Sequence, residues 1–142
     1  MAQQIYVNLP VKDLTRTVAF FGKLGFKLEP KFSNDDAACM IVGENIFVML
    51  LVERFFKTFT PNPISDARLS TEVLLCLSRE SREEVDEMVR KAVAAGGNTY
   101  KEPQDLGFMY GHGFQDLDGH MWELVYMAPT AAASEGRTND EE

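Results

Sequence analysis

The sequence is poor in the residue types that most often carry metal or thiol chemistry. Its 142 residues include only two histidines and two cysteines, which are His112, His120, Cys39 and Cys76. Both cysteines lie in apolar runs with no basic neighbour, so we expect buried, reduced thiols. A glycine-rich phosphate loop is also missing. These absences argue against a disulfide scaffold, a zinc knuckle and a P-loop protein.

Long apolar runs and an excess of positive charge are missing as well. No apolar run approaches the roughly 20 residues that a helix needs to cross a bilayer, and residues 1–5 lack the features of a secretion signal. Fourteen basic residues against 22 acidic ones give a net charge of -8. Such a chain repels phosphate backbones. We therefore expect a cytoplasmic protein that binds neither nucleic acid nor a membrane.

The chain does have enough apolar material for a folded core. Hydrophobic residues make up 45% of it and charged residues 25%, which excludes disorder for most of its length. From Thr130 onward the residues are small and mostly polar or acidic. We expect residues 1–127 to form a single domain and residues 128–142 a disordered acidic tail.

The first half of this domain has a clear order of elements. Residues 5–11 alternate apolar and polar side chains, which is typical of a half-buried strand. Asp13 is suited to cap the helix that follows, and Gly25 is suited to end it. After a short extended segment, the apolar runs 37–42 and 46–52 predict a hairpin.

The second half repeats that order. Residues 71–77 predict a strand, and the capping-box pattern at residues 81–84 predicts a helix that ends at two glycines. Residues 98–101 predict a short strand, and residues 109–116 and 121–127 predict a closing hairpin. Such a repeat indicates that neither half buries its apolar face alone. We therefore expect an α+β fold in which two βαβββ modules form a curved, cup-shaped mixed sheet with helices on its outer face.

The modules are expected at about residues 5–53 and 70–127, joined by residues 54–69. In this connection Phe55, Phe56 and Phe59 follow helical spacing. They predict either a short amphipathic turn packed on the core or at a dimer contact, or an aromatic flap over the cup.

Three stretches of the chain match known motifs. Residues 11–13 and 20–26 contain Val-Lys-Asp and Phe-Phe-Gly-Lys-Leu-Gly-Phe, and residues 116–124 read Asp-Leu-Asp-Gly-His-Met-Trp-Glu-Leu. They resemble the V-x-D…F-Y…L-G-F opening and the D-P-D-G-x-x-x-E-L closing hairpin of the vicinal oxygen chelate superfamily, with Phe21 and Leu117 in place of Tyr and Pro. This superfamily includes glyoxalase I, bleomycin-resistance proteins, fosfomycin-modifying enzymes and extradiol dioxygenases. The resemblance implies paired βαβββ modules, commonly assembled as a homodimer.

In the enzymatic branches the resemblance also implies a metal ion, held by the first and last strands of each module. Carried over by motif, these positions are Tyr6 and Glu72 on the first strands and Met49 and Glu123 on the last ones. Metal-dependent relatives usually have His or Gln on the first strands and Glu on the last ones, so this chain keeps only Glu123. A phenol with a pKa near ~10 and a thioether are poor ligands for magnesium, manganese or zinc. The two-histidine, one-carboxylate set of an extradiol dioxygenase is missing at these positions.

Glu72 and Glu123 form a pair of special interest. If both face the cup, their carboxylates repel unless a cation, a proton or a basic ligand group balances them. One hypothesis is that they jointly bind a divalent metal ion. The alternative is that Glu72 reaches solvent and Glu123 is hydrogen-bonded to the neighbouring strand.

His112 is a second candidate for chemistry. A four-residue hairpin loop would pair Asp116 with Met121, and it would put His112 and Tyr110 on the face of Glu123. A slip of one residue would reverse this arrangement. On the expected register, His112 is a candidate general base, ligand donor or metal ligand, or else a satisfied core histidine.

The sequence favours a small-molecule-binding protein of the glyoxalase/bleomycin-resistance type with an incomplete ancestral metal site. It would act by sequestration or by metal-free acid–base chemistry through the candidate catalytic residues Glu123 and His112. The alternative is a metal-dependent lyase or isomerase of glyoxalase I type, with Glu72 and Glu123 holding the ion. The expected ligand-binding residues are Tyr6, Asn8, Met49, Glu72, Cys76, Tyr110, His112 and Glu123.

Overall fold

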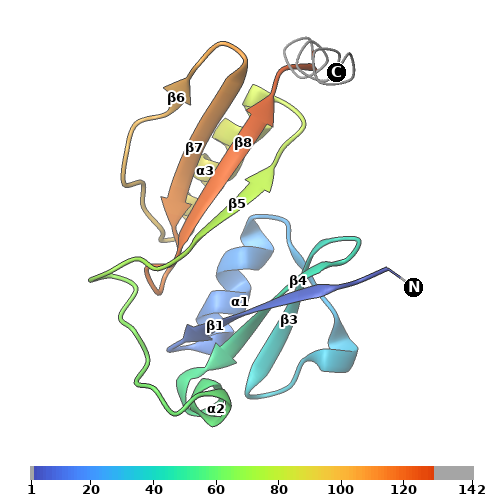
Figure 1. Ribbon diagram of the computed structural model, residues 1–142, viewed down its shortest axis with the longest axis vertical. Coiled ribbons are helices and arrows are strands. Elements are labelled where there is room, and N and C mark those ends of the chain that lie inside the picture. Colours follow the sequence, from blue (N-terminus) through green and yellow to red (C-terminus); the bar gives the residue numbers. More distant parts are fainter. Residues whose placement is uncertain (1, 130–142) are drawn as a thin grey trace, which may run out of the picture. The chain divides into compact units, whose positions relative to one another are not determined.

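The computed structural model of the protein describes residues 2–129, and the chain divides between Ser70 and Thr71 into two units. Each unit contains one four-stranded mixed sheet and a long helix (Figure 1). The predicted α+β fold of two βαβββ modules is confirmed. A cup shared by the two modules stays a prediction, and the predicted acidic tail lies almost entirely outside the described residues.

The first unit follows the predicted order closely. Its sheet has the strand order β1-β4-β3-β2, with β1 parallel to β4 and the other pairs antiparallel. The strands and the main helix are β1 (Ile5–Val11), α1 (Leu14–Lys23), β2 (Lys27–Leu28), β3 (Ala37–Gly43) and β4 (Ile46–Val52). A 3₁₀ turn at Pro30–Phe32 precedes β3, and α2 (Glu53–Phe56) with the 3₁₀ turn Lys57–Phe59 follows β4.

Local chemistry explains why α1 forms where it does. The side chain of Asp13 accepts the backbone N–H of Arg16 at 3.1 Å, which caps the first turn. Gly25 has φ 102, a left-handed conformation that favours glycine after a helix end. Phe20 and Phe21 are buried against the sheet. Helix α1 therefore covers the face of the first sheet on which Leu9 and Val11 are buried, whereas Tyr6 and Asn8, on the opposite face, are exposed.

The second unit repeats this topology with the strand order β5-β8-β7-β6. Its elements are β5 (Leu74–Ser78), α3 (Arg82–Ala94), β6 (Gln104–Asp105), β7 (Met109–Gln115) and β8 (Met121–Met127). Helix α3 is capped by Ser81, whose hydroxyl accepts the N–H of Glu84 at 3.1 Å. It packs on β7 and β8, where Phe114, Trp122 and Leu124 are fully buried.

Two predicted strand boundaries of this unit are wrong. Strand β5 begins at Leu74 and not at Thr71, so Glu72 lies in the exposed segment before it. The predicted strand at residues 98–101 is absent from the described chain. Asn98 makes only an isolated bridge to Gln115, and the edge strand forms later, at Gln104–Asp105.

The connection between the modules contains exposed aromatic side chains. The rings of Phe55 and Phe59 meet edge to face, with their centroids 5.2 Å apart. Phe59 remains 67% exposed. Both interpretations of this segment stay predictions. No helix among the described residues is long and apolar enough to cross a membrane.

Candidate functional site

The register of the second sheet decides which side chains share a face. Glu123 of β8 lies opposite Cys76 of β5 and Gly113 of β7. Trp122 and Leu124 point to the opposite face, where they pack under α3. Glu123 therefore belongs to the helix-free face of this sheet, defined by Leu74, Cys76, Met121, Glu123, Val125 and Met127.

Glu123 is held by two side chains from the segment between α3 and β6. The hydroxyl of Tyr100 donates to Oε2 of Glu123, and the ammonium of Lys101 lies 3.3 Å from Oε1. The Glu123 side chain is only 17% exposed. Since a partly buried carboxylate is costly without a partner, Lys101 and Tyr100 supply the positive charge and the hydrogen bond that this position requires.

Gly113 makes this arrangement possible. A Cβ atom at this position would lie 2.5 Å from the hydroxyl oxygen of Tyr100 and 2.6 Å from the carbonyl oxygen of Trp122. It would also lie 2.9 Å from Oε2 of Glu123. Any side chain larger than hydrogen would therefore displace Tyr100 from the carboxylate. The role of Tyr100 and Lys101 is not visible in the sequence, and glycine opposite Glu123 is the one signal that points to it.

The carboxylate also controls the acidity of its neighbours. Burial, together with the hydrogen bond and the negative charge of Glu123, raises the pKa of Tyr100 well above its usual range. Burial and the charge of Glu123 also raise the pKa of the Cys76 thiol, while Lys101 lowers it. Both groups therefore stay protonated at neutral pH, so neither is a ready base or nucleophile. The expectation that Cys76 is buried is wrong, because the residue as a whole is exposed although its thiol is partly desolvated, whereas Cys39 is buried as expected.

The reactivity of Cys76 tests this electrostatic picture. Glu123→Gln should raise the rate at which Cys76 reacts with Ellman's reagent at pH 7.5 several-fold, because a larger fraction of the thiol ionises. Cys39 is 0% exposed and stays silent in the folded protein. Glu72→Gln is the matched control and should leave the rate unchanged, since Glu72 is exposed and does not act on Cys76. Equal rates for the two variants would contradict the account.

The expected position of His112 and Tyr110 is wrong by one residue of register. The structure pairs Gln115, not Asp116, with Met121. His112 consequently lies opposite Leu124, on the helix side of the sheet. The reason is that Asp116 belongs to the turn, as its carboxylate accepts N–H groups of the turn and of the next strand.

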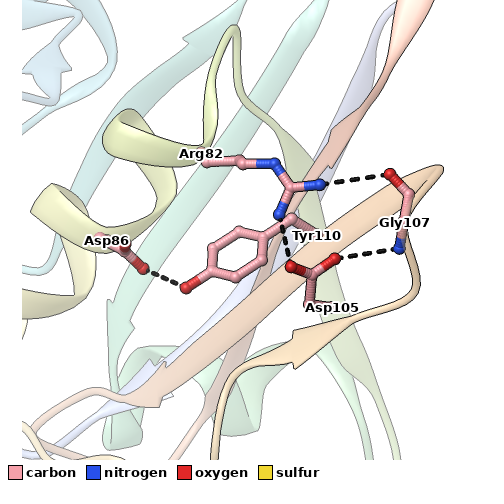
Figure 2. A network of polar contacts seen from close by, with 5 residues as sticks. All are labelled: Arg82, Asp86, Asp105, Gly107 and Tyr110. Atoms are coloured by element: carbon pink, nitrogen blue, oxygen red, sulfur yellow. Dashed lines mark hydrogen bonds and ion pairs between the residues drawn. The ribbon is translucent and has the colours of Figure 1, made fainter.

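On the helix side, His112 and Tyr110 have structural partners. Nε2 of His112 lies 3.2 Å from the carbonyl oxygen of Lys101 and donates to it, because a carbonyl only accepts. The hydroxyl of Tyr110 donates to Asp86 at 2.6 Å (Figure 2). This bond and burial raise the pKa of Tyr110 to about 12. His112 is therefore not placed to act as a base beside Glu123.

Arg82 fixes the loop that leads into β7. Its guanidinium donates to Asp105 at 2.8 Å and to the carbonyl oxygen of Gly107 at 3.2 Å (Figure 2). It also lies 5.1 Å from the centre of the Tyr110 ring. The N–H of Gly107 and the guanidinium both hold the pKa of Asp105 below its usual range. The segment that carries Tyr100 and Lys101 is thus anchored at its far end.

In the first unit, three predicted residues share one face. Asn8 lies opposite Met49, and Tyr6 lies opposite Phe47 two residues earlier on the same two strands, so both pairs share a face. The rings of Tyr6 and Phe47 stack with centroids 4.9 Å apart, and the Tyr6 hydroxyl donates to the side chain of Gln4 at 3.0 Å. The face of the first sheet opposite α1 therefore presents an ordered, partly exposed aromatic pair, with an amide and a thioether beside it.

These residues do not fit the divalent metal ion that the resemblance implies. Tyr6 is a stacked phenol, Met49 a thioether, and Glu72 an exposed carboxylate outside its strand. Glu123 already has Lys101 as its counter-charge. Between residues 2 and 129, no three His, Cys, Asp or Glu side chains are grouped so that they could hold a metal ion. Hard divalent ions require several oxygen or nitrogen donors together.

Comparisons with known proteins agree with this topology. A family model described as Glyoxalase/Bleomycin resistance protein/Dioxygenase superfamily matches residues 3–124. A hypothetical protein from S. aureus is 31% identical, with a TM-score of 0.76, 89% of this chain covered and 95% of that chain.

More distant structures share the fold. A glyoxalase/bleomycin resistance protein/dioxygenase family enzyme from Burkholderia phytofirmans PsJN is 19% identical, with a TM-score of 0.76 over 89% of this chain and 99% of that one. The fosfomycin resistance protein FosX from Listeria monocytogenes is 21% identical, with a TM-score of 0.64 over 89% and 91%. No curated protein matches the chain.

Proposed function

Since the chain belongs to the Glyoxalase/Bleomycin resistance protein/Dioxygenase superfamily, we propose that it binds a small organic molecule without a divalent metal ion as the anchor. The ligand contacts the helix-free face of the second sheet. The observation that carries this proposal is the engagement of both carboxylate oxygens of Glu123, by Tyr100 and by Lys101. In this proposal the Lys101 ammonium supplies the positive charge beside Glu123 for which the resemblance implies a metal ion.

The chemistry of the face favours an uncharged ligand with a carbonyl group. Leu74 is 55% exposed and Met127 is 41% exposed on this face, so it offers apolar surface for a hydrocarbon body. Lys101 is 45% exposed and uses one interaction for Glu123, which leaves further N–H donors for a ligand oxygen. A second negative charge beside Glu123 would be repelled. On the first sheet, Tyr6, Asn8 and Met49 stay proposed ligand contacts.

Binding is favoured over catalysis because the side chains of this face that could transfer a proton are held protonated or are already bonded to each other. Tyr100 and Cys76 both have a raised pKa, and His112 lies on the other face. Glu123 is the one remaining candidate base for the metal-free acid–base alternative. We therefore favour sequestration of the ligand. We also propose that the protein is a homodimer, and sedimentation equilibrium would measure its mass.

The experiment is a thermal-shift screen of small carbonyl compounds, run once with EDTA and once with manganese, nickel or zinc. A stabilising compound should raise the melting temperature equally under all these conditions. Lys101→Met should abolish that response, because it removes the donor, whereas Lys91→Met on the exposed side of α3 should retain it. Stoichiometric metal that is lost in Glu123→Ala, together with binding that EDTA abolishes, would instead favour the metal-dependent lyase or isomerase.

A further inference from the structure

A surface hollow lies between α3 and β7, on the helix side of the second sheet and thus away from Glu123. Its volume is about 730 Å³, and Val89, Val93, Pro103, Tyr110 and His112 contribute to its walls. Small-molecule sites have volumes of roughly 300–1,000 Å³ and mostly apolar walls. Neither the family match nor the proposed function accounts for this hollow.

Most polar side chains in and beside the hollow already have hydrogen-bond or ion-pair partners within the protein. Asp86 accepts the hydroxyl of Tyr110 at 2.6 Å, and one ring nitrogen of His112 donates to the carbonyl oxygen of Lys101. Arg82, next to Tyr110, is committed to Asp105 and Gly107 (Figure 2).

Arg90 also lines the hollow, and it differs from these groups in its contacts. It is exposed and forms no ion pair with any residue from 2 to 129. The hollow thus combines an apolar wall with one guanidinium that has no anionic partner in the described chain. A guanidinium binds a carboxylate through two parallel N–H···O bonds, which fixes the orientation of the bound group.

We propose that this hollow is a second binding site, for a small aromatic carboxylate. The carboxylate pairs with Arg90, and the ring lies against Val89, Val93 and Pro103. An amine is disfavoured because the carboxylate that lines the hollow, Asp86, already accepts the Tyr110 hydroxyl. The site lies on the opposite face of the second sheet from Glu123.

Three probes that share one ring test the ligand class. Benzoate, benzyl alcohol and benzylamine are titrated into ¹⁵N-labelled full-length protein, and the backbone amide shifts are followed. Benzoate should shift the amides of Val93, Ala94 and His112 saturably. The affinity for benzyl alcohol should be lower by about tenfold or more, which is the loss expected when one charge-assisted pair is missing. No saturable shift with benzoate, or tighter binding of benzylamine, would overturn the proposal.

Two variants and two controls complete the test. Arg90→Gln should weaken benzoate binding about tenfold, while Arg16→Gln, an exposed arginine of α1, should not change it. Ala94→Trp fills the hollow from an exposed helix position and should abolish binding. Glu123→Gln should leave benzoate binding intact, so failure here and failure of the proposed function are distinguishable. Unchanged affinity in Arg90→Gln would refute the site.

Discussion

Gly113→Ala is expected to lower the free energy of unfolding by about 3 kcal/mol. The new methyl group would lie 2.6 Å from the carbonyl oxygen of Trp122, which belongs to the neighbouring strand and cannot move without breaking the sheet. It would also push Tyr100 away from Glu123 and leave a poorly exposed carboxylate without its hydrogen bond. Urea unfolding followed by far-UV circular dichroism measures the loss.

Gly111→Ala provides the matched control on the same strand and the same face. There the added Cβ atom would lie 3.5 Å from the carbonyl oxygen of Leu124 and 3.9 Å from Met109, which are ordinary contact distances. We expect a loss below about 1 kcal/mol. Similar losses for the two variants would mean that generic strand effects of glycine, and not the approach of Tyr100, decide the stability.

Asp116→Ala should also cost about 3 kcal/mol, because it removes the acceptor of three N–H groups at once. Asp116 is 5% exposed, and its carboxylate accepts the backbone N–H of Asp118 at 2.9 Å and that of His120 at 3.0 Å. Its second oxygen accepts the indole N–H of Trp122 at 3.0 Å. Without it, the three donors in the turn and the core lose the acceptor that Asp116 provides.

Asp116→Asn separates the two halves of this network. The amide keeps one oxygen for the backbone donors but presents an NH₂ group to the indole of Trp122, so we expect an intermediate loss of about 1–2 kcal/mol. Glu102→Ala, at an exposed position, should change stability by less than about 0.5 kcal/mol. Chemical denaturation checks all three variants. A loss in Asp116→Ala no greater than in Glu102→Ala would show that the turn does not depend on this carboxylate.

Much of the fold was predictable because its local signals agree with its packing. Strand β1 forms at Ile5–Val11, as its apolar alternation predicts, and strand β4 forms at Ile46–Val52, as its apolar run predicts. Asp13 and Ser81 cap their helices as expected. In each case the residue pattern specifies one face to bury, and the local chemistry marks the end of the element.

The register of the last hairpin was not predictable from alternation. Glycines at 111 and 113 have no side chain to show which face is buried, so pairing Asp116 or Gln115 with Met121 fits the pattern equally well. The choice depends on the hydrogen bonds that Asp116 makes within the turn. That one-residue difference removed His112 from the candidate site.

The partners of Glu123 were also beyond the reach of local patterns. Tyr100 and Lys101 lie in a segment that resembles a strand, and their approach to Glu123 spans more than twenty residues of sequence. Such a contact is set by the tertiary path of the chain after α3, which Arg82 and Asp105 anchor. The sequence could indicate that Glu123 needs a counter-charge, but not that Lys101 supplies it.

The most direct test of the central claim is a crystal structure of the protein grown in manganese chloride, with anomalous data collected near the manganese edge. The account predicts the Lys101 ammonium beside Oε1 of Glu123 and the Tyr100 hydroxyl on Oε2, with no anomalous peak at bonding distance from the carboxylate. A manganese peak coordinated by Glu123, with Lys101 displaced into solvent, would contradict it.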